Sequence, residues 1–141
     1  MQEIEKKLAL IQNYIDNDEE NEMIDTEYEL VEYLEENLYS TNILNRLFKF
    51  IEHNNLAFLG MPGPIVHYIE SITDSEKDLL KSIKRKPSLT TLSMLNRILN
   101  SELNIEAKNE YKTLLDDIMK KELSEEIKEE VLDMISTHFE E

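Results

Sequence analysis

Apolar residues recur along most of the chain at alternating intervals of four and three residues, the spacing that places side chains on one face of a helix. Ile4, Leu8, Ile11 and Ile15 form the first of these stripes. Similar stripes follow in later segments, so the pattern predicts about eight amphipathic helices. The later segments are residues 30–38, 43–51, 65–72, 79–83, 92–99, 107–118 and 127–139.

Glycine and proline, which interrupt helices, are nearly confined to one segment. Both glycines and two of the three prolines lie within residues 60–64, and the third proline is Pro87. A sheet protein needs many turn residues, and this chain has almost none, so we expect an all-α protein. Pro64 suits the first position of a helix, and Pro87 is expected to end one. The glycines predict a positive φ or a closely packed backbone in the turn between two helices.

Several polar residues are placed where helices should begin. Asn104 and Ser124 precede the last two apolar stripes, and both residue types are favoured N-caps. A threonine followed three residues later by a glutamate has the spacing of a capping box. This spacing predicts helix starts at Thr26 with Glu29 and at Thr73 with Glu76.

Residues 95–107 are similar to residues 115–127 at a constant offset of 20 residues. Each copy contains the end of a helix, a Glu-Leu pair, a capping residue and the start of the next helix. One helix in about 20 residues gives helix pairs of about 40, within the range of HEAT or armadillo repeats. Two architectures stay open: an array of antiparallel helical hairpins, or a compact irregular bundle. The length fits a single domain over residues 1–141.

The chain is strongly acidic, and its charge is unevenly distributed. Asp and Glu number 31 against 15 Lys and Arg, which gives a net charge of -16. Residues 1–38 contain 13 acids and 2 bases, residues 46–100 contain 5 acids and 8 bases, and residues 101–141 contain 13 acids and 5 bases. This balance argues against a partner that is nucleic acid or an anionic membrane surface, since both are bound through clustered Lys and Arg.

The segment from Asp16 to Glu36 contains 11 acidic residues and no basic one. Carboxylates four residues apart on a helix, such as Glu32 and Glu36, repel each other by about 0.2–0.5 kcal/mol. Helix stability alone would therefore favour mixed charges. The segment is either a solvated face that keeps the protein soluble or a surface that binds a basic protein.

Tyrosines within and beside this segment favour the second interpretation, because tyrosine is common at protein interfaces. Tyr33 is the one that we expect to point outward. The candidate partner-binding residues are Asp18, Glu19, Glu20, Glu22, Asp25, Glu29, Glu32, Tyr33 and Glu36. A second candidate is the acidic face near the C-terminus, with Asp116, Asp117, Glu129, Glu130 and Asp133.

Nothing in the sequence indicates catalysis or a bound cofactor. The chain has no cysteine, so a disulfide, a thiolate nucleophile and a Cys-ligated zinc site are excluded. Its three histidines lie in different expected helices and form no compact ligand pair for a metal. Two glycines cannot build a phosphate-binding loop. We therefore expect a non-enzymatic protein with neither cofactor nor metal.

The sequence shows no targeting or membrane segment. Its N-terminus lacks the basic region and apolar run of a signal peptide, and nowhere do about 18 apolar residues occur together. These features, with the absence of cysteine, predict a cytoplasmic protein.

Residues 60–70, Gly-Met-Pro-Gly-Pro-Ile-Val-His-Tyr-Ile-Glu, form the most distinctive motif of the chain. His67 and Glu70 within it are three residues apart and can share a helix face. His67 is either a contact for a partner or a structural group bonded to a backbone carbonyl or an acid. The motif residues are Gly60, Pro62, Gly63, Pro64, His67 and Glu70.

This motif resembles a segment of small acidic all-helical immunity proteins from bacterial polymorphic or contact-dependent toxin systems. The resemblance implies a non-enzymatic inhibitor that binds a cognate toxin and blocks its active surface, without saying which residues bind. A nuclease-like toxin must present a basic surface to hold phosphates, and an acidic protein is complementary to it. The alternative is a HEAT-like scaffold or adaptor in another assembly.

Overall fold

The computed structural model describes residues 2–37 and 41–139, which form helices joined by turns, with no strand among them. The all-α prediction is therefore confirmed. The helices in these ranges are α1 (Gln2–Asp16), α2 (Glu20–Glu36), α3 (Thr41–His53), α4 (Pro64–Glu70), α5 (Ser75–Arg85), α6 (Leu89–Leu99), α7 (Ile105–Ile118) and α8 (Glu125–Phe139).

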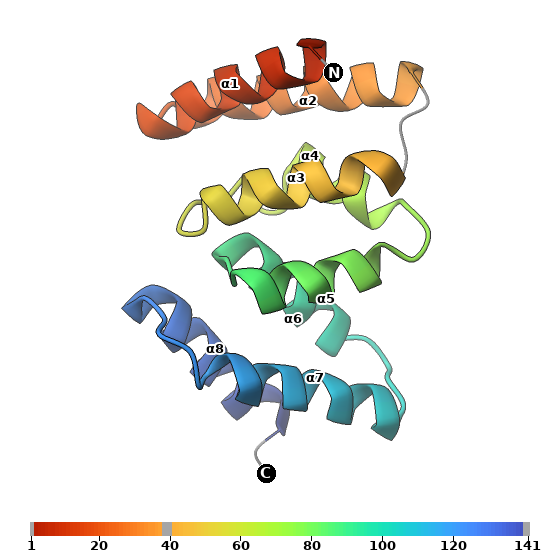
Figure 1. Cartoon of the computed structure of the whole chain (residues 1–141), viewed down its shortest axis with the longest axis vertical. Helices are drawn as coiled ribbons and strands as arrows, with labels where there is room; N and C mark the ends of the chain where they lie inside the picture. Colours follow the sequence, from red (N-terminus) through yellow and green to blue (C-terminus); the bar gives the residue numbers. More distant parts are fainter. Residues whose placement is uncertain (1, 38–40, 140–141) are drawn as a thin grey trace.

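Consecutive helices form pairs that lie one below another along the long axis of the molecule (Figure 1). The pair α1/α2 lies at the N-terminal end and the pair α7/α8 at the C-terminal end. Helices α3, α5 and α7 form one layer, and α4, α6 and α8 lie behind it. Of the two architectures that the sequence left open, the structure shows the stack of helix pairs.

The stack is held by apolar contacts within each layer. Helix α2 packs on α4, α3 on α5, and α6 on α8. One cluster of buried apolar side chains extends from Ile4 and Leu34 in the first pair to Met134 in the last. Burying a side chain of this size contributes about 1.5–3 kcal/mol to stability. The periodic apolar positions therefore supply both the helix faces and the contacts between neighbouring pairs.

Polar contacts connect the terminal pair α1/α2 to the rest of the stack. Arg46 of α3 donates two hydrogen bonds of 2.7 Å to the Glu5 carboxylate of α1. The hydrogen bonds and the charge of Arg46 lower the pKa of Glu5. Gln12 and Asn54 exchange side-chain amide hydrogen bonds of 2.9 and 2.8 Å. These contacts fix how the terminal pair lies on α3.

The expected N-caps of the last two helices are confirmed. The Asn104 side chain accepts a hydrogen bond from the backbone N–H of Ala107 at 2.8 Å, and Ser124 accepts one from Ile127 at 3.4 Å. Pro64 is the first residue of α4. The helix before Pro87 ends at Arg85, as expected.

Both predicted capping boxes are wrong. Helix α2 begins at Glu20, so Thr26 lies inside it and donates its hydroxyl hydrogen to the backbone carbonyl of Glu22 at 2.9 Å. Helix α5 begins one residue after Asp74, whose φ of 65° is left-handed, and Thr73 lies outside it. Leu38, the last residue of the second apolar stripe, lies outside the described residues.

Replacing Asn104 with Ala is expected to lower the free energy of unfolding by about 1 kcal/mol, because the first turn of α7 loses its side-chain acceptor. Urea denaturation measures the change. Asn109→Ala, at an exposed position inside the same helix, is the matched control and should leave stability unchanged or slightly raised. Equal losses in both variants would show that the cap contributes nothing specific.

Candidate functional site

Helix α2 has two chemically different faces. Its 17 residues include eight acids and no base. Met23, Leu30 and Leu34 are buried against the rest of the protein. The opposite face is exposed and contains four acids spaced by four, three and four residues, which places them along one side of the helix. We call these residues the acidic row: Asp25, Glu29, Glu32 and Glu36.

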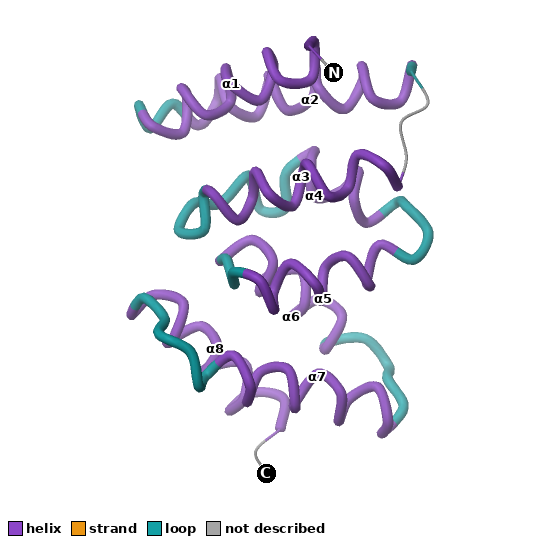
Figure 2. Tube along the Cα trace, in the orientation of Figure 1, coloured by secondary structure: helices purple, strands orange, loops and turns teal. Residues whose placement is uncertain are grey.

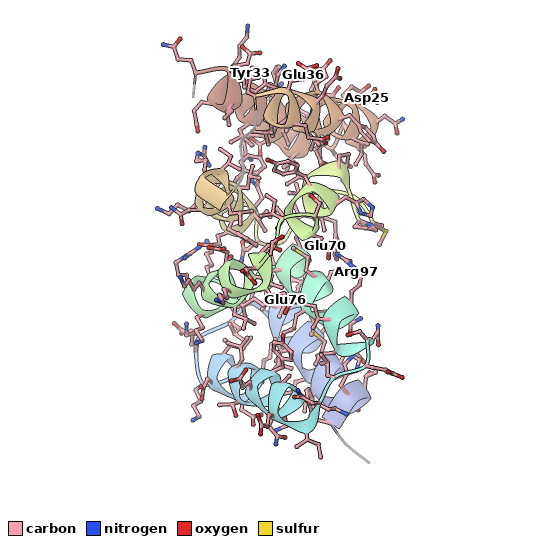
Figure 3. The ribbon with its side chains drawn as sticks, turned by 90° about the vertical axis from the view of Figure 1, so that its right-hand side faces the viewer. Asp25, Tyr33, Glu36, Glu70, Glu76 and Arg97 are labelled. Carbon is pink, nitrogen blue, oxygen red and sulfur yellow. The ribbon has the colours of Figure 1, made fainter. Side chains whose placement is uncertain are left out.

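The acidic row lies on the terminal pair of the stack, where none of the other described helix pairs covers it (Figures 1 and 3). From Asp25 to Glu36 it extends for about 16 Å, at 1.5 Å per helical residue. Beside its C-terminal half, Glu3 and Lys7 of α1 line a shallow depression together with Glu29, Glu32, Tyr33 and Glu36 of α2. Lys7 is paired with Glu3 at 3.2 Å. Among the described residues, no Lys or Arg forms an ion pair with a carboxylate of the row.

The remaining predicted acids lie at the other end of α2. Asp18 and Glu19 belong to the α1–α2 turn, while Glu20 and Glu22 belong to the first helical turn, and all four are exposed. Asp18 has a φ of 55°, a left-handed conformation that Asp tolerates better than most residues. Acids in the first turn are stabilised by the helix dipole. The predicted residues therefore form two groups on one helix.

The two acidic regions of the protein differ in how far their charges are compensated. Among the ion pairs of the described residues, none involves a carboxylate of α2. In the C-terminal region, Asp116 is paired with Lys112 at 2.7 Å and Asp117 with Lys120 at 3.6 Å. Glu129, Glu130 and Asp133 lie on α8. Asp116 and Asp117 are thus partly neutralised, whereas Glu129, Glu130 and Asp133, like the carboxylates of α2, form no ion pair among the described residues.

The tyrosine expected to point outward was the wrong one. Tyr33 is half-buried and packs against the core, whereas Tyr28 exposes 62% of its surface. Tyr33 follows Leu30 by three residues, so it lies at the edge of the buried stripe. Tyr28 lies between Asp25 and Glu32 on the exposed face. Tyr28 is thus an aromatic member of the acidic surface that the sequence analysis missed.

Glu27 is the one acid of α2 that is fully buried. Its Oε1 accepts a hydrogen bond of 3.2 Å from the backbone N–H of Ile65, in the first turn of α4, and its Oε2 has no partner among the described residues. Burial raises the pKa of Glu27 to about 8, and the Ile65 hydrogen bond offsets only part of this effect. The carboxyl group is therefore mostly protonated at neutral pH.

Residues 60–64 form the turn that precedes α4 and lies next to the buried Glu27 side chain. Gly60 has a φ of 123°, and a Cβ placed on Gly63 would lie 1.8 Å from the Leu59 carbonyl oxygen. Both the positive φ and the close backbone contact expected of the glycines are thus confirmed. The Met61–Pro62 peptide bond is cis. These residues bring the backbone of α4 against the buried face of α2.

The histidine and glutamate of the motif do not contact each other as a pair. His67 is exposed, and its side chain has no hydrogen bond or ion pair within the described ranges. Glu70 instead accepts a hydrogen bond from Arg97 of α6 at 2.8 Å, which connects two neighbouring pairs of the stack (Figure 3). The structure thus gives no support to a structural hydrogen bond of His67.

Other kinds of site have no counterpart in the described part of the chain. Over residues 2–37 and 41–139, no three His, Asp or Glu side chains are grouped as a metal site would need. None of the helices in these ranges has the length and apolar character of a membrane span. The chain matches no protein-family model, no curated protein and no solved structure. The surface chemistry of α2 is thus the main guide to function.

Proposed function

We propose that this chain is a non-enzymatic binding protein whose acidic row contacts a basic surface on a protein partner. The observation that supports this is the exposed face of α2, where carboxylates follow one another without a base or an ion pair. Such a face is less favourable for the helix than mixed charges, because like charges repel. A positively charged partner removes the repulsion on binding.

The partner that fits this surface best is a nuclease-like toxin domain, as the resemblance of residues 60–70 to immunity proteins implies. A nuclease binds phosphates through Lys and Arg, so its active surface is positively charged. A row of carboxylates about 16 Å long can cover such a surface and attract it over distance by electrostatic steering. The inhibitor would act by occupying the surface, which requires no catalytic group of its own.

A second candidate function is a scaffold or adaptor. The stack of helix pairs favours it, because stacked pairs offer extended faces on which several proteins can bind. An adaptor of this kind would use the long faces of α3 to α8. The first proposal places one partner on the terminal pair.

The experiment is capture of partners from the native host by the tagged protein, using two variants matched in charge. The row variant combines Asp25→Asn, Glu29→Gln, Glu32→Gln and Glu36→Gln. The C-terminal control variant combines Asp116→Asn, Asp117→Asn, Glu129→Gln and Asp133→Asn. Each variant removes four negative charges, and the control variant also breaks the exposed Lys112–Asp116 and Lys120–Asp117 pairs, which contribute little to stability.

We expect the wild-type protein and the C-terminal control variant to retain the same basic protein, and the row variant to retain much less of it. The retained protein should arrest growth when expressed alone and be neutralised by co-expression with this chain. Equal capture by both variants would contradict the role of the row. Capture of several non-basic proteins by all three would favour the adaptor.

A further inference from the structure

A groove lies beside the acidic end of α2, where two connections of the chain meet. One wall is the α1–α2 turn and the start of α2, with Asp18, Glu19 and Glu20, and the other wall is the α3–α4 connection, with Leu56, Phe58 and Met61. Both connections lie at the same edge of the stack (Figure 2). The groove therefore combines a carboxylate rim with an apolar wall.

The apolar wall is unusually exposed. Leu56, Phe58 and Met61 expose 49%, 44% and 87% of their surfaces. Single exposed apolar residues are ordinary, but several around one groove with a polar rim are typical of a binding site. Contact with another molecule would remove this surface from water and so favour association.

The backbone of the α3–α4 connection is anchored to the rest of the protein next to these side chains. Leu59, within the same segment, is fully buried. The backbone carbonyl of Asn55 accepts a hydrogen bond from the N–H of Leu89 at 2.8 Å, and that of Ala57 accepts one from the Thr90 hydroxyl at 3.1 Å. A wall fixed before binding loses little conformational entropy when a ligand arrives. The exposed apolar side chains thus belong to an ordered surface.

The charge of the rim decides between possible occupants. A second copy of this chain, with a net charge of -16, would bring its own carboxylates toward Asp18, Glu19 and Glu20. A segment in which Lys or Arg adjoins an apolar side chain would pair with the rim and cover the wall at once. The rim leads along α2 into the acidic row through Glu22, so one basic partner can reach both.

We propose that this groove binds a segment of the basic partner in which apolar and cationic side chains alternate or adjoin. The acidic row attracts the partner, and the groove holds it by contact with Phe58 and Met61. This inference rests on the proposed function for the nature of the partner. It differs in what it predicts: a preference for apolar residues among equally charged ligands.

Two labelled peptides of about ten residues test the groove, one alternating Lys with Leu and one alternating Lys with Ser. Binding to the full-length protein is measured by fluorescence anisotropy. The groove variant is Phe58→Ala with Met61→Ala. Its matched control is Ile105→Ala with Leu132→Ala, which removes two exposed apolar side chains elsewhere. Thermal denaturation of both variants checks that each still folds.

We expect the Leu peptide to bind about tenfold more tightly than the Ser peptide, and the groove variant alone to abolish this preference. Equal binding of both peptides to the wild-type protein would overturn the proposal that the groove binds apolar side chains. Loss of the preference in the control variant would overturn it as well. The row variant should bind the Ser peptide more weakly than the wild-type protein does. If it binds the Ser peptide equally well, the result counts against the proposed function and not against the groove. Analytical ultracentrifugation of wild type and the groove variant tests for self-association. If the wild-type protein is a dimer and the groove variant is a monomer, the groove is an interface between two copies of this chain, which would overturn the proposal.

Discussion

Replacing Glu27 with Gln is expected to remove most of the pH dependence of stability between pH 6 and pH 9. In the folded protein, burial raises the pKa of Glu27 from 4.5 to about 8. In the unfolded chain, the same carboxyl group is hydrated and titrates near its ordinary value. Between these two pKa values, the folded state holds a proton that the unfolded state has lost.

The sign of the effect follows from this difference. A raised pKa of an acid in the folded state stabilises the fold at low pH, and this stability is lost as the pH rises through the folded-state pKa. At 1.36 kcal/mol per pH unit, the wild-type protein should lose about 2–3 kcal/mol from pH 6 to pH 9 through this one group. The amide introduced by Glu27→Gln has no charge to bury, so the variant keeps that stability.

Urea denaturation at pH 6, 7, 8 and 9 measures the difference between wild type and Glu27→Gln. Glu29→Gln is the matched control, because Glu29 lies two residues further along the same helix and is exposed. We expect the control to follow the wild-type profile. Parallel profiles for wild type and Glu27→Gln would show that Glu27 does not titrate above neutral pH in the folded protein.

Replacing Gly63 with Ala should destabilise the protein by about 3 kcal/mol, roughly a hundredfold in the unfolding equilibrium. The added Cβ would lie 1.8 Å from the Leu59 carbonyl oxygen and 2.9 Å from the Glu27 carboxylate. The first of these atoms belongs to the backbone, so a side-chain rotation cannot relieve the contact. The turn between Leu59 and Gly63 would have to open, and the Glu27 side chain would have to shift as well.

The measurement is thermal and urea denaturation of Gly63→Ala beside Met61→Ala. Met61 lies two residues away in the same connection and is largely exposed, so its truncation should change stability by less than about 0.5 kcal/mol. If Gly63→Ala is as stable as Met61→Ala, the close approach of the Gly63 and Leu59 backbones is not a feature of the folded protein.

Local signals in the sequence were sufficient where one residue type determines the structure. Asn104 and Ser124 cap their helices because a side-chain oxygen next to free N–H groups is favourable in almost any surroundings. Pro64 begins α4 for an equally local reason. The glycines of residues 60–64 indicated an unusual backbone, and the structure shows one.

The same kind of signal failed where a residue has two uses. Thr26 and Glu29 have capping-box spacing, but a threonine inside a helix can also bond to the carbonyl four residues earlier, as Thr26 does with Glu22. A capping box does exist at Ser88 and Thr91, where threonine stands in place of the usual Glu or Gln. A spacing that requires Glu or Gln at the third helical position therefore does not identify this box.

Composition located the acidic surface but not the roles of its members. Glu27 looks like one more charge in an acidic segment, yet it follows Met23 by four residues and precedes Leu30 by three. That position lies on the buried stripe of α2, and the periodicity could have indicated it. The sequence pattern does not say which helix covers the stripe or that a backbone N–H of α4 meets the carboxylate. Both depend on a contact between residues 38 positions apart in the sequence.

The most direct test of the acidic row is the rate at which the captured basic protein associates with wild type, the row variant and the C-terminal control variant, measured at several salt concentrations. Steering by the row predicts that the wild-type rate falls as salt screens the charges. The row variant should associate about tenfold more slowly at low salt and depend less on salt, while the control stays within about twofold of wild type. A control variant slowed as much as the row variant would show that total charge governs the encounter, and an unchanged rate for the row variant would place the binding surface elsewhere.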